Sequence, residues 1–182
     1  SFTITRSPEA PRLVRKLSGM LRYMTDECDQ PLVPLHKELK ILRDYIDLEK
    51  VRYGDRLTLH IDVRGDTRQK LIAPLLLIPF VENSFKHGSS RMLERPWISM
   101  DIRIGPDKLR FRISNSKPAE SSRHNGENGI GLGNVRQRLK LLYPGEHHLE
   151  ISRKEDSYEV RLDLPLHAAG VTHFSGSPVP GF

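Results

Sequence analysis

The 182-residue sequence predicts an α+β protein, in which helices cover one face of a β-sheet and an α-helical hairpin precedes them. Two observations lead to this prediction. Apolar residues recur about every 3.6 residues as far as Tyr53, whereas from Arg56 onwards most recur at every second residue. The second part also contains two apolar stretches that are long enough for helices. Because a sheet with one apolar face is buried most simply under helices, we expect a two-layer α/β sandwich.

Composition and charge narrow the possible classes of protein. Lysine and arginine number 29 against 23 aspartate and glutamate, and 37% of the residues are hydrophobic, which is typical of a folded globular chain. The single Cys28 excludes an internal disulfide and a cysteine-based zinc site. The longest apolar run, 71–81, is shorter than the roughly 20 residues of a membrane-spanning helix. Basic residues are scattered among acidic ones without interleaved aromatics, so we expect no nucleic-acid partner.

Two amphipathic helices joined by a short turn are predicted for residues 1–54. The first begins after a capping sequence at 7–9 and ends before 29–31. Its apolar positions are Leu13, Leu17, Met20 and Met24. The second covers 34–53 and ends at Gly54. Its apolar positions are Leu35, Leu39, Leu42, Ile46 and Tyr53. Such a hairpin has little core of its own, so its apolar faces need either the rest of the chain or a second copy as a partner.

Strands and helices alternate in the remaining sequence. The apolar pattern predicts a strand over 57–63, a helix over 74–87, a β-hairpin with strands at 97–104 and 109–113, a helix over 132–143, and strands at 149–151 and 160–164. Residues 116–128 are polar and rich in Ser, Asn and Gly, which predicts a loop. We therefore divide the chain into a helical region, 1–54, an α/β domain, 55–166, and a disordered tail, 167–182.

The first segment that can carry chemistry is Pro-Phe-Val-Glu-Asn-Ser-Phe-Lys-His-Gly at 79–88. Asn83, Lys86 and His87 are three and four residues apart, so they share one helical face. An amide oxygen can ligate Mg²⁺, and lysine and imidazole can bind phosphate. The spacing alone is equally typical of a solvated helix face on which Asn83 satisfies the backbone.

The second segment is Gly-Ile-Gly-Leu-Gly-Asn at 129–134, which follows a polar loop and precedes a helix. Glycines let a backbone approach phosphates closely, and a helix N-terminus favours an anion. A Rossmann fingerprint is excluded because a long loop, rather than a strand, comes first, and a Walker motif is excluded because no Gly-Lys-Ser/Thr follows. Taken alone, the segment is as typical of an ordinary glycine-rich turn.

Taken together, Glu-Asn-Ser-Phe-Lys-His-Gly at 82–88 and Gly-Ile-Gly-Leu-Gly-Asn-Val-Arg-Gln-Arg-Leu at 129–139 resemble the N box and the G box of GHKL-type ATP-binding domains. Both are similar to the boxes of LytS/YehU-type bacterial sensor histidine kinases, and the helical region is similar as well. The resemblance covers about residues 7–166. It implies a GHKL ATPase-like sandwich with a mixed, mostly antiparallel sheet, and makes 1–54 part of a helical dimerisation and phosphotransfer region.

The resemblance also implies roles for individual residues and two cofactors, ATP and Mg²⁺. Asn83 matches the ligand of the Mg²⁺ in Mg-ATP, and Lys86 and His87 match positions that face the phosphates. The loop at 116–128 matches the lid over the nucleotide. Within the G box, whose backbone lies beside the phosphates, the implied nucleotide-binding residues are Gly129, Gly131, Leu132 and Gly133.

Three features depart from the general family pattern. Asn115 stands where many histidine kinases have an aspartate that reads the adenine amine, and its amide oxygen accepts a hydrogen bond without a charge. Pro79 stands where hydrolytic GHKL ATPases have a glutamate that activates water, which argues against gyrase- or chaperone-like hydrolysis. The Asn-Pro-His-Phe-like box with the phosphoacceptor histidine does not occur, and His36 is not a good substitute for it. We expect the phosphoacceptor to lie upstream of Ser1.

The function that the resemblance implies is that of the catalytic portion of a two-component sensor histidine kinase, which binds Mg-ATP and transfers the γ-phosphoryl group to an upstream histidine. The implied partners are a response regulator of the LytTR type and a second copy in a full-length homodimer. The implied location is a cytoplasmic domain of an inner-membrane sensor, with membrane contact only through upstream segments. Asn115 motivates an alternative from another class, a GHKL-like interaction module without effective nucleotide binding.

Overall fold

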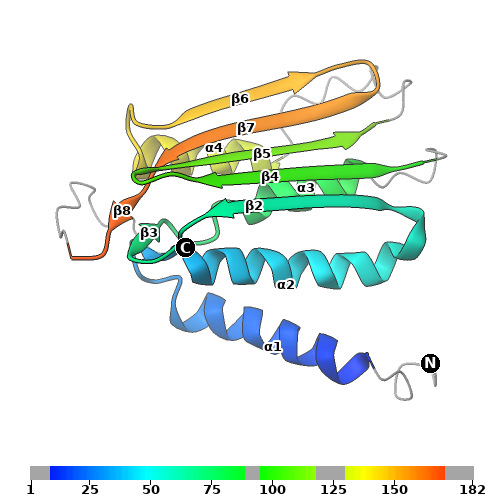
Figure 1. The fold of residues 1–182 in the computed structure, drawn as a ribbon, viewed down its shortest axis with the longest axis horizontal. Coiled ribbons are helices and arrows are strands. Elements are labelled where there is room, and N and C mark those ends of the chain that lie inside the picture. The colour runs from blue at the N-terminus through cyan, green and yellow to red at the C-terminus, as the bar shows by residue number, and fades with distance from the viewer. Residues whose placement is uncertain (1–8, 89–94, 118–129, 171–182) are drawn as a thin grey trace.

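The fold is that of a computed structural model, which describes residues 9–88, 95–117 and 130–170 (Figure 1). The helices are α1 (Ala10–Asp26), α2 (Leu35–Tyr53), α3 (Ile78–Gly88) and α4 (Ile130–Leu142), and a short 3-10 helix, η2 (Gly54–Arg56), follows α2. The strands are β1 (Val33–Pro34), β2 (Thr58–Gly65), β3 (Lys70–Ile72), β4 (Trp97–Ile104), β5 (Lys108–Ser116), β6 (His148–Arg153), β7 (Ser157–Pro165) and β8 (His167–Ala168).

Five strands form the main sheet, in the order β2-β4-β5-β7-β6. β2 runs parallel to β4, and the other neighbours are antiparallel. The predicted β-hairpin is confirmed, because β4 and β5 pair over their length up to Ile104 opposite Leu109. A smaller sheet, in the order β1-β3-β8, lies at one end of the molecule (Figure 1). The mixed, mostly antiparallel sheet agrees with the fold that the resemblance implies.

Helices α3 and α4 cover one face of the main sheet, which confirms the two-layer sandwich (Figure 1). Every second residue of β4 is buried, as the alternation of apolar residues predicts. Phe80 of α3 packs on Phe111 of β5, with ring centroids 5.9 Å apart. The core therefore lies between the helices and the sheet, and it holds α3 in place.

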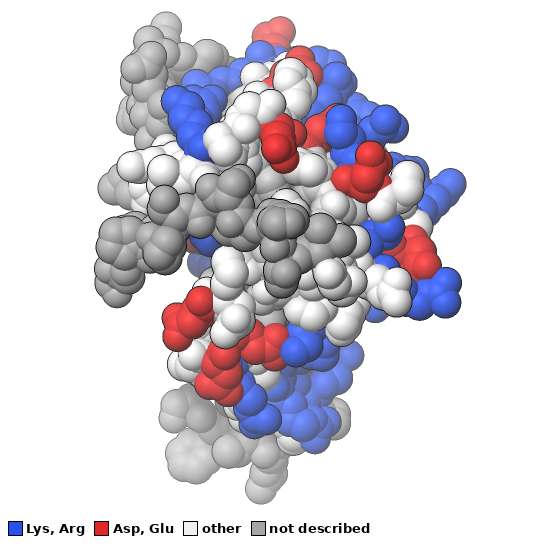
Figure 2. Space-filling view, turned by 90° about the vertical axis from the view of Figure 1, so that its left-hand side faces the viewer, with Lys and Arg blue, Asp and Glu red and all other residues white. Residues whose placement is uncertain are grey.

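The other face of the sheet carries charged side chains that pair across strands. Arg112 of β5 donates from Nε to Glu159 of β7 at 2.8 Å, and Arg103 of β4 donates to Asp62 of β2 at 3.0 Å. Figure 2 shows basic and acidic side chains next to one another on the surface that it views. This mixture agrees with the scatter of charges along the sequence.

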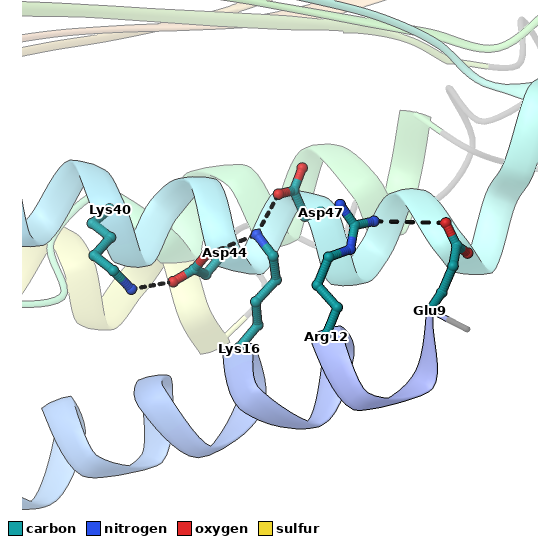
Figure 3. Close-up of polar contacts among 6 residues, drawn as sticks. All are labelled: Glu9, Arg12, Lys16, Lys40, Asp44 and Asp47. Atoms are coloured by element: carbon teal, nitrogen blue, oxygen red, sulfur yellow. Dashed lines mark hydrogen bonds and ion pairs between the residues drawn. The ribbon is translucent and has the colours of Figure 1, made fainter. Parts of the chain in front are cut away.

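Helices α1 and α2 form the predicted hairpin and pack against each other. Met20 and Tyr23 of α1 are buried. Leu17 and Met24 of the predicted apolar face are 51% and 39% exposed, so the rest of the described chain does not cover them. The reason is that α1 has two apolar stripes, and only the one with Met20 and Tyr23 faces α2. Lys16 binds Asp44 and thereby adds a polar link between the two helices (Figure 3).

The structure begins α3 at Ile78, whereas the apolar pattern predicts a helix from Pro74. The residues between them form a turn, called the 74–77 turn below, in which Leu75 has a φ of +51°. A left-handed conformation costs a non-glycine residue roughly 1–2 kcal/mol, so neighbouring contacts must hold it. Leu76 and Leu77 are buried as they would be in a helix, which is why periodicity alone does not reveal the turn.

The chain after β7 returns to the small sheet. β8 pairs with β3, and the ring of His167 stacks on Tyr143 with centroids 6.0 Å apart. The prediction of a disordered tail from residue 167 is therefore wrong for 167–170, and the remainder, 171–182, lies outside the described residues. Among the helices that the structure describes, none has the length and apolarity needed to cross a membrane.

Candidate nucleotide-binding site

The N-box helix, α3, is anchored by its apolar side and presents its polar side outward. Phe80 and Phe85 are buried in the core. Asn83 is half-buried, and Lys86 and His87 are exposed. The helix therefore keeps the three predicted ligand-binding side chains out of the core and within about one turn of one another.

The C-terminal end of α3 lies directly against the end of β5. A Cβ atom added to Gly88 would lie 2.6 Å from the Cβ of Asn115, so only glycine allows this approach. The hydroxyl of Ser116 donates to the Gly88 carbonyl oxygen at 3.1 Å and fixes the contact. Ser116 is the last residue of β5, so the predicted loop at 116–128 begins one residue too early. The close approach brings Asn115 next to the N box.

Asn115 offers an unused hydrogen-bond acceptor at this contact. Its side chain is fully buried, and its Nδ2 donates to the Ser116 carbonyl oxygen at 2.9 Å. Its Oδ1 has no hydrogen-bond partner among the described residues. An unpaired buried acceptor costs about 1–3 kcal/mol, which a ligand with an N–H donor would recover. The amide oxygen can therefore accept from an exocyclic amine, as the aspartate at this position does in the resembled family.

Lys86 and His87, in the last turn of α3, are the side chains of this helix that can bind an anionic ligand, whereas Glu82 carries a negative charge. Partial burial lowers the pKa of His87, and the neighbouring Lys86 ammonium lowers it further. The imidazole is therefore neutral near pH 7, and it can donate one hydrogen bond to a phosphate oxygen. Lys86 supplies the positive charge.

The G-box helix, α4, is positioned by Leu132, which is 7% exposed. Within the described part of the chain, a Cβ added to Gly131 or Gly133 would meet nothing within 4 Å, so the backbone at the start of α4 is open. Gly129 and residues 118–128 of the predicted lid lie outside the described residues. The structure thus places Asn83, Lys86 and His87 on α3 and Asn115 beside Gly88 at the end of this helix. From the G box it shows residues 130–139, which lie in α4.

A pocket of about 260 Å³ between α2 and α3 was not predicted from the sequence. Tyr53 of α2 stacks on Phe85 of α3 in its wall, with ring centroids 6.0 Å apart. The spacing of Glu82 and Lys86, one helical turn apart, is the signal that could have indicated it. The pocket is lined by Tyr45, Glu49, Arg52, Tyr53, Glu82, Phe85 and Lys86. Lys86 belongs to both this pocket and the N box.

The described residues contain no cluster of three or more His, Cys, Asp or Glu side chains that could hold a metal. The Mg²⁺ that the resemblance implies would instead be held by one protein oxygen together with the phosphates of the nucleotide. Mg²⁺ in nucleotide sites is commonly held in this way, by one or two protein ligands, phosphates and water. According to the resemblance, the amide oxygen of Asn83 would be this ligand.

Comparisons of this sequence with known proteins match it to sensor kinases and to a histidine kinase family model. The family model "Histidine kinase" matches residues 1–57. The chain is 32% identical over 176 residues to the sensor histidine kinase YpdA of Escherichia coli strain K12, and 35% identical over 136 residues to the sensor protein kinase HptS of Staphylococcus aureus. It is also 29% identical over 171 residues to the sensor protein LytS of Oceanobacillus iheyensis. These matches cover 91%, 74% and 86% of this chain but 30%, 23% and 29% of the relatives, so the chain spans less than a third of their length.

Comparisons of structure support the fold. The histidine kinase domain of the blue-light-activated kinase EL346 from Erythrobacter litoralis matches with a TM-score of 0.56 at 16% identity, over 88% of this chain and 81% of that chain. The catalytic domain of histidine kinase ThkA matches with a TM-score of 0.54 at 13% identity, over 74% of this chain and 95% of that chain. Both likenesses show that the fold is that of histidine kinase domains. The chain belongs to the sensor histidine kinases, and among them to the LytS type.

Proposed function

We propose that this chain is the catalytic portion of a sensor histidine kinase, which binds Mg-ATP and transfers the γ-phosphoryl group to a histidine upstream of these residues. The observation that carries the proposal is the buried, unpaired Oδ1 of Asn115, which lies beside the end of the N-box helix. In this proposal, residues 1–54 are part of the dimerisation and phosphotransfer region, and 55–166 are the ATP-binding domain.

The residues on α3 would act by position and charge. Asn83 would hold Mg²⁺, which neutralises phosphate oxygens when it is bound. Lys86 would place a positive charge beside the phosphates, and His87 would donate a hydrogen bond to them. Asn115 would accept from the adenine amine and so orient the base. Phosphoryl transfer needs mainly alignment and charge stabilisation, and these residues can supply both.

The test is a thermal melt with and without Mg-ADP, repeated with EDTA. A ligand at about 100 times its dissociation constant stabilises the folded state by about 2.7 kcal/mol, which raises the melting midpoint by several degrees. We expect a metal-dependent rise for the wild type and none for Asn83→Ala, while Asn83→Asp, which keeps an oxygen ligand, retains part of it. A full metal-dependent rise in Asn83→Ala would refute the role of Asn83.

The same melt separates the kinase function from the alternative, an interaction module without effective nucleotide binding. That alternative predicts no change in the midpoint at millimolar nucleotide, with or without metal. No observation in the described residues favours it, because Asn115 keeps a free acceptor oxygen where the family reads adenine.

Membership of the family supports a proposal for the partners and the location. We propose a response regulator of the LytTR type as the phosphoryl acceptor, and a second copy of the chain as the partner of α1. We also propose that these residues form a cytoplasmic domain of an inner-membrane sensor.

A further inference from the structure

Glu38 of α2 is a buried carboxylate at the place where the helical hairpin meets the α/β domain, with 2% of its surface exposed. The hydroxyl of Tyr23 in α1 donates to its Oε1 at 2.5 Å, and the backbone N–H of Leu75 donates to the same oxygen at 2.8 Å. Burial raises the pKa of Glu38, and the two hydrogen bonds and the charge of Arg138 oppose this increase. Neither the N box nor the G box includes Glu38.

The turn that Glu38 contacts is held from its other side by α4. Arg138 donates from Nη2 to the Pro74 carbonyl oxygen at 2.9 Å and from Nη1 to the Leu75 carbonyl oxygen at 3.4 Å. Just before the turn, the N–H of Ala73 donates to the hydroxyl of Tyr143 at 2.8 Å. These contacts explain how Leu75 keeps its left-handed backbone, because α2 satisfies its N–H and α4 satisfies its carbonyl group.

The 74–77 turn leads directly into the N-box helix. The N–H of Phe80 donates to the Leu77 carbonyl oxygen at 3.2 Å, so the last residue of the turn also starts α3. Arg138 lies on α4, which begins in the G box. One turn therefore joins the two helices that carry the nucleotide motifs to the hairpin that carries Tyr23 and Glu38.

We propose that Glu38 is a positioning residue for nucleotide binding, which holds the 74–77 turn against Arg138 and thereby sets how α3 and α4 lie relative to each other. The inference rests on the proposed function, because it assigns Glu38 a role in an ATP site. Since coupling between sites is reciprocal, a nucleotide held by α3 and α4 should in turn stabilise the contact between Glu38 and the turn.

Asp44 provides a matched control on the same helix. It is also buried, at 7% exposure, and it also joins α2 to α1, since it accepts from Lys16 at 2.9 Å (Figure 3). Asp44 also accepts from Lys40 at 2.6 Å, and both of these hydrogen bonds lie within the hairpin. Glu38→Gln and Asp44→Asn are the same chemical change, so they differ in whether the 74–77 turn is affected.

The experiment measures the Mg-ADP dissociation constant of the wild type and both variants by calorimetry, well below their melting midpoints. Glu38→Gln should weaken binding by about tenfold, and Asp44→Asn should leave it nearly unchanged even though both variants lower the midpoint. Mg-ADP should also slow hydrogen exchange at the amides of Leu75 and Leu76 in the wild type. If Glu38→Gln does not fold, Tyr23→Phe removes a single hydroxyl and should weaken binding in the same direction.

Three results would overturn the inference: unchanged affinity in Glu38→Gln, an equal loss of affinity in Asp44→Asn, or exchange at Leu75 that nucleotide does not alter. A wild-type protein that binds no Mg-ADP would refute the proposed function instead. In that case, hydrogen exchange measured without nucleotide tests whether Glu38 is coupled to the 74–77 turn and α3. Faster exchange at Leu75 and Phe80 in Glu38→Gln, but not in Asp44→Asn, upholds this coupling, and equal exchange in the two variants rejects it.

Discussion

Gly88 and Asn115 show how a single missing side chain shapes the candidate site. The N-box helix can end against β5 only because residue 88 has no Cβ, and that approach brings the buried amide of Asn115 beside α3. A polar side chain buried with a free acceptor is unfavourable on its own, and such groups often mark functional sites. The geometry thus connects the last residue of the N box to the residue expected to read adenine.

Replacing Gly88 by alanine should therefore disturb both stability and binding. The added methyl group would lie 2.6 Å from the Asn115 Cβ and 3.0 Å from its Nδ2, so α3 or β5 must move. We expect a loss of about 1–3 kcal/mol in the free energy of unfolding in urea, together with weaker Mg-ADP binding. Gly19→Ala in α1, where the added atom meets nothing within 4 Å, should instead stabilise the protein by about 0.5–1 kcal/mol. If Gly88→Ala left the free energy of unfolding unchanged or raised it, as Gly19→Ala should, that result would contradict the close contact.

For single residues, the sequence predicts which side chains can carry chemistry better than it predicts which residues contact one another. Asn83, Lys86, His87 and Asn115 are predicted from the family motifs, and the structure places Asn115 beside Gly88, at the end of the helix that carries the other three. Glu38 was missed, although an acidic residue between Leu35 and Leu42 on an apolar helix face is a visible signal. Its partner, the N–H of Leu75, is 37 residues away and belongs to a turn that apolar periodicity reads as helix.

At the scale of secondary-structure elements, the contact between α1 and α2 is stabilised by apolar packing and by a cluster of charged side chains. Lys16 reaches across to Asp44 at 2.9 Å and Asp47 at 2.5 Å, and Lys40 reaches Asp44 along the same helix (Figure 3). Burial alone would raise the pKa of Asp44, but the hydrogen bonds from Lys16 and Lys40 lower it below its usual value of 3.8. The same carboxylates raise the pKa of Lys16.

The lowered pKa of Asp44 predicts part of the acid sensitivity of the hairpin. Because the folded-state pKa lies below the unfolded value, ionised Asp44 stabilises the fold fully above pH 3.8, and this contribution is lost as the pH falls through the folded value. Asp44→Asn should reduce the free energy of unfolding by about 1–3 kcal/mol near pH 7 and make its decline in acid shallower than in the wild type. Urea unfolding between neutral pH and acid checks this, and identical acid slopes in both proteins would refute it.

The boundaries of elements were predictable where a local signal exists. Gly54, with a φ of +57°, ends α2 as predicted, and the turn after Ile104 closes the predicted hairpin. The predictions for the start of α3 and for the residues of β8 were wrong for the same reason. Their backbone groups are satisfied by distant partners, such as Glu38 for Leu75 and β3 for β8, and a one-dimensional pattern does not contain those partners.

For the whole molecule, the two-layer architecture follows from the change of period along the chain, but the place of the hairpin does not. The predicted hairpin needed a partner for its apolar faces, and the structure provides one for α2, whose residues Leu35, Leu42 and Ile46 are buried in the common core. Figure 1 shows α1 on the outside of the molecule, with α2 between it and the rest of the fold. The outer stripe of α1 is left uncovered and consists of Val14, Leu17, Leu21 and Met24.

We expect a second copy of the chain to cover this outer stripe weakly. Leu17 and Leu21 are 51% and 55% exposed, one turn apart, but one helix of 17 residues buries far less than the roughly 1,200–2,000 Å² of a stable interface. Light scattering should therefore find monomers at low micromolar concentration and dimers only at much higher concentration. Replacing Leu17 and Leu21 together by glutamate should abolish the association and leave the Mg-ADP affinity unchanged. Leu141→Glu, at an equally exposed leucine of α4, should leave the association intact. A tight dimer at low micromolar concentration, or a dimer that survives the double substitution, would show that another surface joins the two copies.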